Sequence, residues 1–127
     1  MGDQTHHLEV LNQVYNQLKV IFEKSEQSMY LYLDDVHKVC NQIFSDLLGY
    51  GSPDDWAKTA DFMELVDEQS QGTLVTAYQN AMQRLIGSTI EVTWKKKGGG
   101  TVDSSCILVP ISYNGHLMAL HFISNTS

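Results

Sequence analysis

Residues 40–56 read CNQIFSDLLGYGSPDDW, and this stretch carries the densest set of structural signals in the chain. Asn41 suits the N-cap of a helix, and Gly49 stands where a left-handed C-terminal cap is favoured. A second start follows at once, because Ser52 precedes Pro53 at a first helical position, with acidic residues in the first turn. The stretch therefore predicts two short consecutive helices.

Strand patterns flank these helices on both sides. β-forming residues fill 28–33, and an Asp-Asp turn separates them from a second short strand at 37–40. Beyond the helices, 72–86 has the apolar spacing of a longer central helix. Glycine-containing turns then separate three more strands, at 89–96, 102–113 and 116–124. This order predicts an α+β fold, with one five-stranded antiparallel sheet and helices over one face.

Residues 1–24 are predicted to form an amphipathic helix ahead of a domain at 25–127. A seam with alternating spacings of three and four runs along this helix: Leu8, Leu11, Tyr15, Leu18 and Phe22. The last two strands carry apolar residues on both faces, so a second layer should cover the sheet, and this helix is the natural candidate. Two interpretations stay open: a docked core helix, or a contact with a second copy in a homodimer.

Composition excludes several classes of protein. The 127 residues suffice for one domain, and the hydrophobic fraction of 43% is typical of a globular protein. A net charge of −7 argues against nucleic-acid binding, because phosphate affinity comes from clustered basic side chains. No apolar window approaches the length of a membrane span, so no membrane contact is expected. Cys40 and Cys106 lack the spacing of a redox or metal motif, which favours a reducing, cytoplasmic location.

The order of the elements and several landmarks resemble the PAS domain family, from about Ile21 to the C-terminus. The most specific similarity is Asn41, then Phe44, then Leu-Leu-Gly-Tyr at 47–50, before a capped helix. The stretch KKKGGGTVDSSCILVPISYNG at 95–115 is similar to the family's hairpin, with basic residues and glycines at the tip. The resemblance implies a PAS-like sheet with its helices.

Two landmarks of the family are missing. Ser124-Asn125-Thr126 stands where such domains commonly close on Asp-x-Thr, whose polar groups tie the domain to a signalling helix beyond it. Ser124 can still donate or accept a hydrogen bond at that place. Val66-Asp67-Glu68 replaces the usual His-Pro ahead of the long helix. The fold prediction therefore depends on the landmarks taken together.

The resemblance also implies a function. Such a domain binds a small ligand or a partner and relays the change to a fused output domain, most often a histidine kinase or a GGDEF diguanylate cyclase. The chain ends where an output helix would begin, which suggests the sensor portion of a longer receptor. The implied mechanism is a population shift, not a reaction. A ligand-free dimerisation module is the main alternative, and a small enzyme is a third.

Cofactor-bearing members of the family carry residues that this chain lacks. A haem-binding member would have a ligand histidine on the central helix, and 72–86 contains none. Flavin photosensors of the family carry a reactive cysteine in an Asn-Cys-Arg-Phe-Leu-Gln run on a helix, whereas Cys40 and Cys106 fall on strands. The resemblance therefore argues against haem and cysteine-linked flavin, and the cofactor is unknown.

The histidines and acidic residues form no catalytic or metal pattern in the sequence. His116 and His121 are five apart and point to opposite faces of one strand, so they do not share a metal ion. His6 and His7 lie on a terminus. We therefore predict no metal site, no catalytic residues and no enzyme activity.

A ligand site is predicted between the central helix and the sheet. The side chains expected around it are Tyr30, Phe62, Tyr78, Met82 and Trp94, with the alternate strand residues Met29, Leu31 and Leu33 opposite the helix and Tyr30 or Thr93 as polar anchors. Such a concavity would hold a small apolar or aromatic ligand. The alternative is that side chains fill the space, as they do in most small cores.

Overall fold

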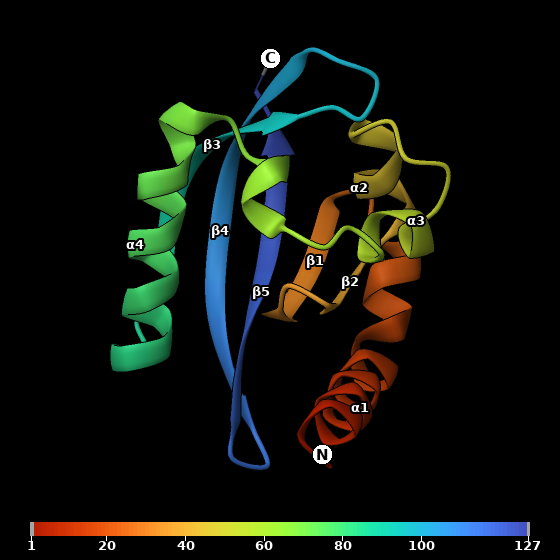
Figure 1. The fold of residues 1–127 in the computed structure, drawn as a ribbon, viewed down its shortest axis with the longest axis vertical. Coiled ribbons are helices and arrows are strands. Elements are labelled where there is room, and N and C mark those ends of the chain that lie inside the picture. The colour runs from red at the N-terminus through yellow and green to blue at the C-terminus, as the bar shows by residue number, and fades with distance from the viewer. Residues whose placement is uncertain (1, 127) are drawn as a thin grey trace.

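The computed structural model describes residues 2–126, with side chains from residue 6 onward, and contains one sheet flanked by helices (Figure 1). The helices are α1 (Gly2–Lys24), α2 (Gln42–Leu47), α3 (Pro53–Ala57), the short 3₁₀ helix η1 (Phe62–Leu65) and α4 (Glu68–Arg84). The strands are β1 (Ser28–Asp34), β2 (His37–Cys40), β3 (Ser88–Lys95), β4 (Thr101–Tyr113) and β5 (His116–Asn125). They pair antiparallel in the order β2-β1-β5-β4-β3, which confirms the predicted fold class.

Side-chain caps fix the two short helices after the first hairpin. Asn41 Oδ1 accepts hydrogen bonds from the backbone N–H groups of Phe44 and Met29, each at 3.1 Å, so one side chain starts α2 and ties it to β1. Gly49 follows α2 with a φ of 83°, which is the left-handed conformation. Ser52 Oγ accepts a hydrogen bond at 3.2 Å from the backbone N–H three residues further on, in the first turn of α3. The predicted capping is confirmed.

The central helix differs from its prediction at both ends. It begins earlier because Asp67 acts as N-cap, with a carboxylate oxygen 3.3 Å from the backbone nitrogen of Gln69. It also ends earlier, because Leu85 takes the left-handed conformation, with a φ of 55°, that glycine would favour. Gly87 serves a different purpose: a Cβ atom there would lie 3.0 Å from the carbonyl oxygen of Leu108 in β4. Close approach to the sheet therefore favours glycine at this position.

Each face of the sheet has its own core, and Figure 1 shows α1 and α4 on opposite sides. The larger core, on the α4 side, includes Tyr30, Trp56 and Trp94. On the other side, Leu11 and Phe22 of α1 pack in a second cluster with side chains of β1 and β5. The N-terminal helix thus supplies the second layer. Among the described residues, no helix combines the length and apolarity required to cross a membrane.

A buried lysine joins α3 to the first hairpin. Lys38 of β2 is only 2% exposed. Its ammonium group donates to the backbone carbonyl oxygens of Asp35, Ala57 and Thr59, at 3.3 Å for Ala57 and 2.6 Å for Thr59. Burial lowers the pKa of Lys38, against the opposing attraction of Asp35. These bonds hold the helical segment beside the hairpin that borders the cavity described next.

Candidate functional site

A cavity of about 290 Å³ lies between α4, η1 and the inner face of the sheet. Helix α4 contributes two pairs of neighbouring side chains, one helical turn apart, and the sheet contributes aromatic rings. The lining residues are Tyr30, Tyr32, Asp35, Phe62, Met63, Leu74, Val75, Tyr78, Gln79 and His121. Since most of these side chains are aromatic or aliphatic, the space suits an apolar molecule with few polar groups.

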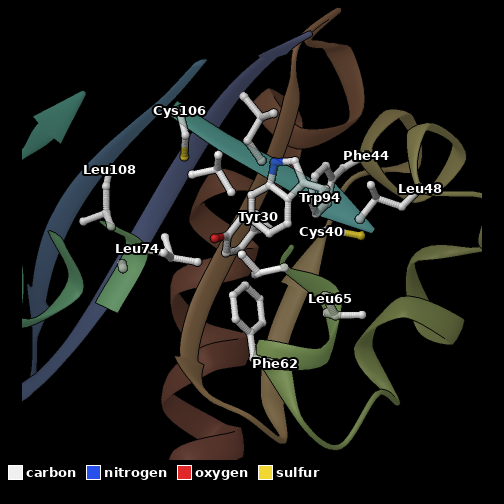
Figure 2. Close-up of a cluster of buried hydrophobic side chains, with 14 of the residues drawn as sticks. Tyr30, Cys40, Phe44, Leu48, Phe62, Leu65, Leu74, Trp94, Cys106 and Leu108 are labelled. Atoms are coloured by element: carbon white, nitrogen blue, oxygen red, sulfur yellow. The ribbon is translucent and has the colours of Figure 1, made fainter. Parts of the chain in front are cut away.

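Tyr30 lines the cavity and lies at the centre of the aromatic core. Its ring stacks on that of His121, with centroids 3.8 Å apart and planes 12° from parallel. It also stacks on Phe44 at 5.3 Å and meets Trp94 edge-on at 5.7 Å. Figure 2 shows its hydroxyl on the side of Leu74 of α4. That oxygen is buried and has no hydrogen-bond partner among the described residues. An unpaired buried hydroxyl costs about 1–3 kcal/mol, so a hydrogen-bond partner for this group would stabilise the domain.

Polar groups gather at the rim of the cavity, beside the β1–β2 turn. The Tyr32 hydroxyl donates to the Asp35 carboxylate. The Tyr78 hydroxyl lies 3.5 Å from the carbonyl oxygen of Leu33. Burial is the main cause that raises the pKa of Tyr32, and the hydrogen bond to Asp35 raises it further. Burial also raises the pKa of Tyr78, with a smaller contribution from the charges of Asp34 and Asp35. Both tyrosines therefore remain protonated donors.

His121 contributes an uncharged ring to the cavity wall. It is 1% exposed, and its Nδ1 lies 3.2 Å from the carbonyl oxygen of Ala119, so we assign the proton to Nδ1 as the donor of that bond. Desolvation lowers the pKa of His121 to about 3, outweighing the backbone contacts with Ala119 and Tyr30 that raise it. The imidazole is therefore neutral at physiological pH and adds stacking area rather than charge.

The structure places three of the predicted pocket residues around the cavity: Tyr30, Phe62 and Tyr78. Trp94 is fully buried behind them, where its Nε1 donates to Ser104 Oγ at 2.8 Å. Met82, one turn beyond Tyr78 on α4, packs on the core away from the lining. That these residues bind a ligand stays a prediction.

The expectation that Met29, Leu31 and Leu33 face the cavity is wrong. Met29 and Leu31 are buried in the core on the α1 side, and Leu33 packs against that same cluster. The alternate residues of β1, Tyr30 and Tyr32, line the cavity instead. Because side chains alternate along a strand, the error amounts to choosing the wrong face.

Thr93 is not a polar anchor of the cavity either. It alternates with the buried Trp94, and its Oγ1 donates to a carboxylate oxygen of Asp103 at 2.8 Å. Sequence reasoning also missed several lining residues: Tyr32, Asp35, Met63, Leu74, Val75, Gln79 and His121. The spacing of four between Leu74 and Tyr78 was a usable signal, since it puts both on one helix face.

The seam of α1 packs on the protein's own sheet. Leu11 and Phe22 are each 2% exposed, Tyr15 and Leu18 are partly buried against the same cluster, and Leu8 is 50% exposed. The rings of Tyr15 and Phe22 meet edge-on at 5.4 Å. The arrangement favours the docked-helix interpretation, and the predicted homodimer contact stays a prediction.

Both cysteines are buried on strands. Cys40 ends β2 and Cys106 lies within β4, with both side chains in the larger core. Desolvation raises the pKa of Cys106 to about 12 and is also the main cause of the raised pKa of Cys40. Thiols in such surroundings are poor nucleophiles at neutral pH.

Histidines that the sequence separates come together in space. His7, which the sequence places on a terminus, lies on α1 with its Nδ1 3.0 Å from Asp34 Oδ2. His37 Nδ1 lies 2.8 Å from the other carboxylate oxygen of Asp34. The prediction of no metal site rested on sequence neighbours, which do not show this group.

Solved structures with the same arrangement are PAS and LOV domains. The LOV protein of Rhodobacter sphaeroides aligns with a TM-score of 0.71 at 12% identity, over 91% of this chain and 68% of its own. A PAS domain from a two-component sensor histidine kinase aligns at 0.68 and 9% identity, over 91% and 98%. The PAS domain of an HTR-like protein from Haloarcula marismortui aligns at 0.65 and 18% identity, over 95% and 98%. No family model and no curated protein matches the sequence. The architecture and these likenesses together show that the chain has the PAS domain fold.

Proposed function

We propose that this chain is the sensory domain of a signalling protein and that it binds a small ligand in the cavity beside Tyr30. The PAS fold supports the sensory role, and one similar domain comes from a two-component sensor histidine kinase. The observation that carries the proposal is the buried, unpaired Tyr30 hydroxyl beside an aromatic-lined cavity of about 290 Å³.

The size and lining of the cavity define the class of ligand. A volume of about 290 Å³ suits a compact molecule. The rings of Phe62, Tyr78 and His121 favour an apolar or aromatic body. The Tyr30 hydroxyl calls for one hydrogen-bond acceptor on that body. We therefore infer a small aromatic or apolar compound with a single inward-facing acceptor.

The path from the cavity to the end of the domain is short. Tyr30 and His121 stack across the neighbouring strands β1 and β5. Further along β5, Ser124 Oγ accepts a hydrogen bond at 3.1 Å from the Nε2 of Gln27, just before β1. Ser124 thus makes a polar contact where the sequence lacks the family's Asp. A bound ligand would shift the balance between two arrangements of β1 and β5. A fused histidine kinase or GGDEF diguanylate cyclase would respond to that shift.

Replacing Val75 with tryptophan is expected to abolish ligand retention. Val75 lines the cavity from α4 and is 39% exposed, so an indole there can occupy the cavity without displacing the packed core. The measurement is a native mass spectrum of protein purified without added ligand, compared with the denatured mass. The wild type should carry an adduct that leaves on denaturation, and the variant should not.

Val20→Trp is the matched control, because Val20 is 67% exposed on α1, across the sheet from the cavity. It should keep the adduct.

Tyr30→Phe removes one hydrogen bond and should weaken ligand binding about fivefold, for a bond worth about 1 kcal/mol. A wild type that carries no adduct and shows no saturable binding of indole as a probe would contradict the ligand proposal.

A ligand-free dimerisation module is the second candidate, favoured by exposed apolar side chains on one side of the molecule. Ile21 of α1 is 50% exposed, and Ile107 of β4 is 46% exposed on the sheet face that α1 covers in part. Such side chains gain from burial against a second copy.

The double variant Ile21→Glu, Ile107→Glu is expected to convert a dimer to a monomer, since carboxylates are costly in an apolar contact. Both side chains are exposed, so the fold should survive. Size-exclusion chromatography with light scattering gives the mass. Val75→Glu, on the α4 side, is the control and should leave the dimer intact. A monomeric wild type, or a dimer that persists in the double variant, would exclude this surface.

A further inference from the structure

Four of the chain's five histidines meet at one end of the molecule. The ring of His7 lies 5.7 Å from that of His37 and 5.5 Å from that of His116, and the rings of His6 and His116 are 4.6 Å apart. Figure 1 shows the N-terminal end of α1 beside the turn between β4 and β5. These side chains come from three distant segments, so the fold brings them together.

Asp34, the last residue of β1, lies between two of these histidines. Its Oδ2 lies 3.0 Å from Nδ1 of His7 and 3.0 Å from Nδ1 of His37. The same His37 Nδ1 lies 2.8 Å from Oδ1 of Asp34. Oδ1 further accepts from the backbone N–H groups of Val36 at 3.0 Å and His37 at 2.8 Å. Turn formation explains the backbone bonds, because Asp side chains commonly bond the chain two residues on. It does not explain two imidazoles beside Oδ2.

The spacing of these atoms is close enough to that of metal ligands for small side-chain shifts to complete a site. One donor atom from each of His7, Asp34 and His37 lies within 4.8 Å of the others. Zinc bonds to nitrogen and oxygen of about 2.0–2.2 Å in tetrahedral geometry put ligand atoms roughly 3.3–3.6 Å apart. The side chains of His7 and Asp34 are 35% and 36% exposed, so an ion can reach them and small shifts are available.

The donor set selects the class of ion. Two imidazole nitrogens and one carboxylate oxygen suit Zn²⁺ and related transition-metal dications, whereas Ca²⁺ and Mg²⁺ prefer oxygen ligands throughout. Water, or the nearby His116, can complete the coordination. The two backbone N–H groups on Oδ1 orient the Asp34 carboxylate, as outer contacts commonly do at metal sites.

We propose that His7, Asp34 and His37 bind Zn²⁺ or a closely related transition-metal dication, and that the ion fastens α1 to the β1–β2 turn. Nδ1 of each histidine and Oδ2 of Asp34 are the ligands. Each imidazole binds the ion as its neutral form: Nδ1 gives up the proton that bonds Asp34 in the metal-free protein, and Nε2 carries the ring's proton instead. Asp35, the next residue, lines the ligand cavity, so the bound ion also holds the cavity rim in one arrangement.

Calorimetric titration of the full chain with zinc chloride is expected to show one saturable site. His7→Ala and Asp34→Asn should each weaken binding at least tenfold. Asparagine keeps an acceptor oxygen for the turn, so Asp34→Asn tests the metal ligand and not the turn. Co²⁺ serves as a second probe, because its visible absorption reports a protein-bound site and should be lost in both variants.

Asp35→Asn is the matched control: it makes the same charge change one residue away, on a carboxylate outside the group of three. It should bind Zn²⁺ as the wild type does. Circular dichroism without metal checks that each variant is folded. Zinc should raise the melting temperature of the wild type and Asp35→Asn but not of Asp34→Asn. Equal zinc affinity in Asp34→Asn and Asp35→Asn, or no one-to-one binding by the wild type, would overturn the proposal.

Discussion

Replacing Trp94 with alanine is expected to lower the free energy of unfolding by about 3–5 kcal/mol, the usual range for a buried aromatic residue. Trp94 is fully buried, its ring meets those of Phe44 at 5.4 Å and Phe62 at 6.1 Å, and its Nε1 donates to Ser104 Oγ at 2.8 Å. Because domains are typically stable by about 5–15 kcal/mol, the variant should be marginal. Urea unfolding followed by circular dichroism measures the loss.

The two tryptophans provide a matched pair that separates hydrogen bonding from packing. Trp94 Nε1 has a partner, whereas the buried Trp56 Nε1 has none among the described residues. Trp94→Phe loses that bond, and Trp56→Phe removes an unpaired N–H group. Trp94→Phe should therefore cost about 1 kcal/mol more than Trp56→Phe. Equal losses of unfolding free energy in the two phenylalanine variants would show that the Trp94 hydrogen bond adds no stability. For Trp94→Ala, a loss below about 1 kcal/mol would contradict the place of Trp94 in the core.

The short helices could be predicted from the sequence because their signals are local. Asn41 and Ser52 cap backbone groups only three residues away, and Gly49 adopts the left-handed turn that ends α2. The end of α4 could not be predicted in this way. Gly87 allows close approach to Leu108 of β4, a contact between distant segments, so its position did not mark the helix end.

The cavity could be located from the sequence, but only part of its lining could be predicted. β1 is apolar on both faces, with Met29 and Leu31 on one and Tyr30 and Tyr32 on the other. A strand of this kind does not reveal which face meets α4, because both are covered. The prediction added the aliphatic Met29 and Leu31 to a mainly aromatic pocket, whereas aromatic stacking around Tyr30 decides which face of β1 meets the cavity.

The histidine group at the β1–β2 turn illustrates a second limit. His7 and Asp34 are 27 residues apart, and only the docking of α1 on the sheet brings them into contact. Within the turn itself, Asp34 and His37 are three apart, a spacing that turn formation already explains. Residues close together in the sequence therefore gave no indication that His7 lies beside the Asp34–His37 pair.

His121 should make the domain less stable in mild acid. Its burial lowers the pKa to about 3 in the folded protein, against about 6.5 in the unfolded chain. Between these values the unfolded chain binds a proton that the folded protein does not, so stability falls as the pH drops through this window. The slope reaches about 1.4 kcal/mol per pH unit. Lowering the pH from about 7.5 to about 4.5 should thus remove about 2–3 kcal/mol through this one residue.

His121→Phe isolates this effect, because it keeps a ring on Tyr30 while removing the titrating group and its bond to Ala119. Urea unfolding at a series of pH values should show the wild type losing stability faster than the variant, by about 2–3 kcal/mol over that range. The exposed His6→Gln is the control and should follow the wild type. Every other acid and base is common to both proteins. Parallel curves for the wild type and His121→Phe would therefore mean that His121 can take up a proton without unfolding the domain, and the cavity wall would then be open to water.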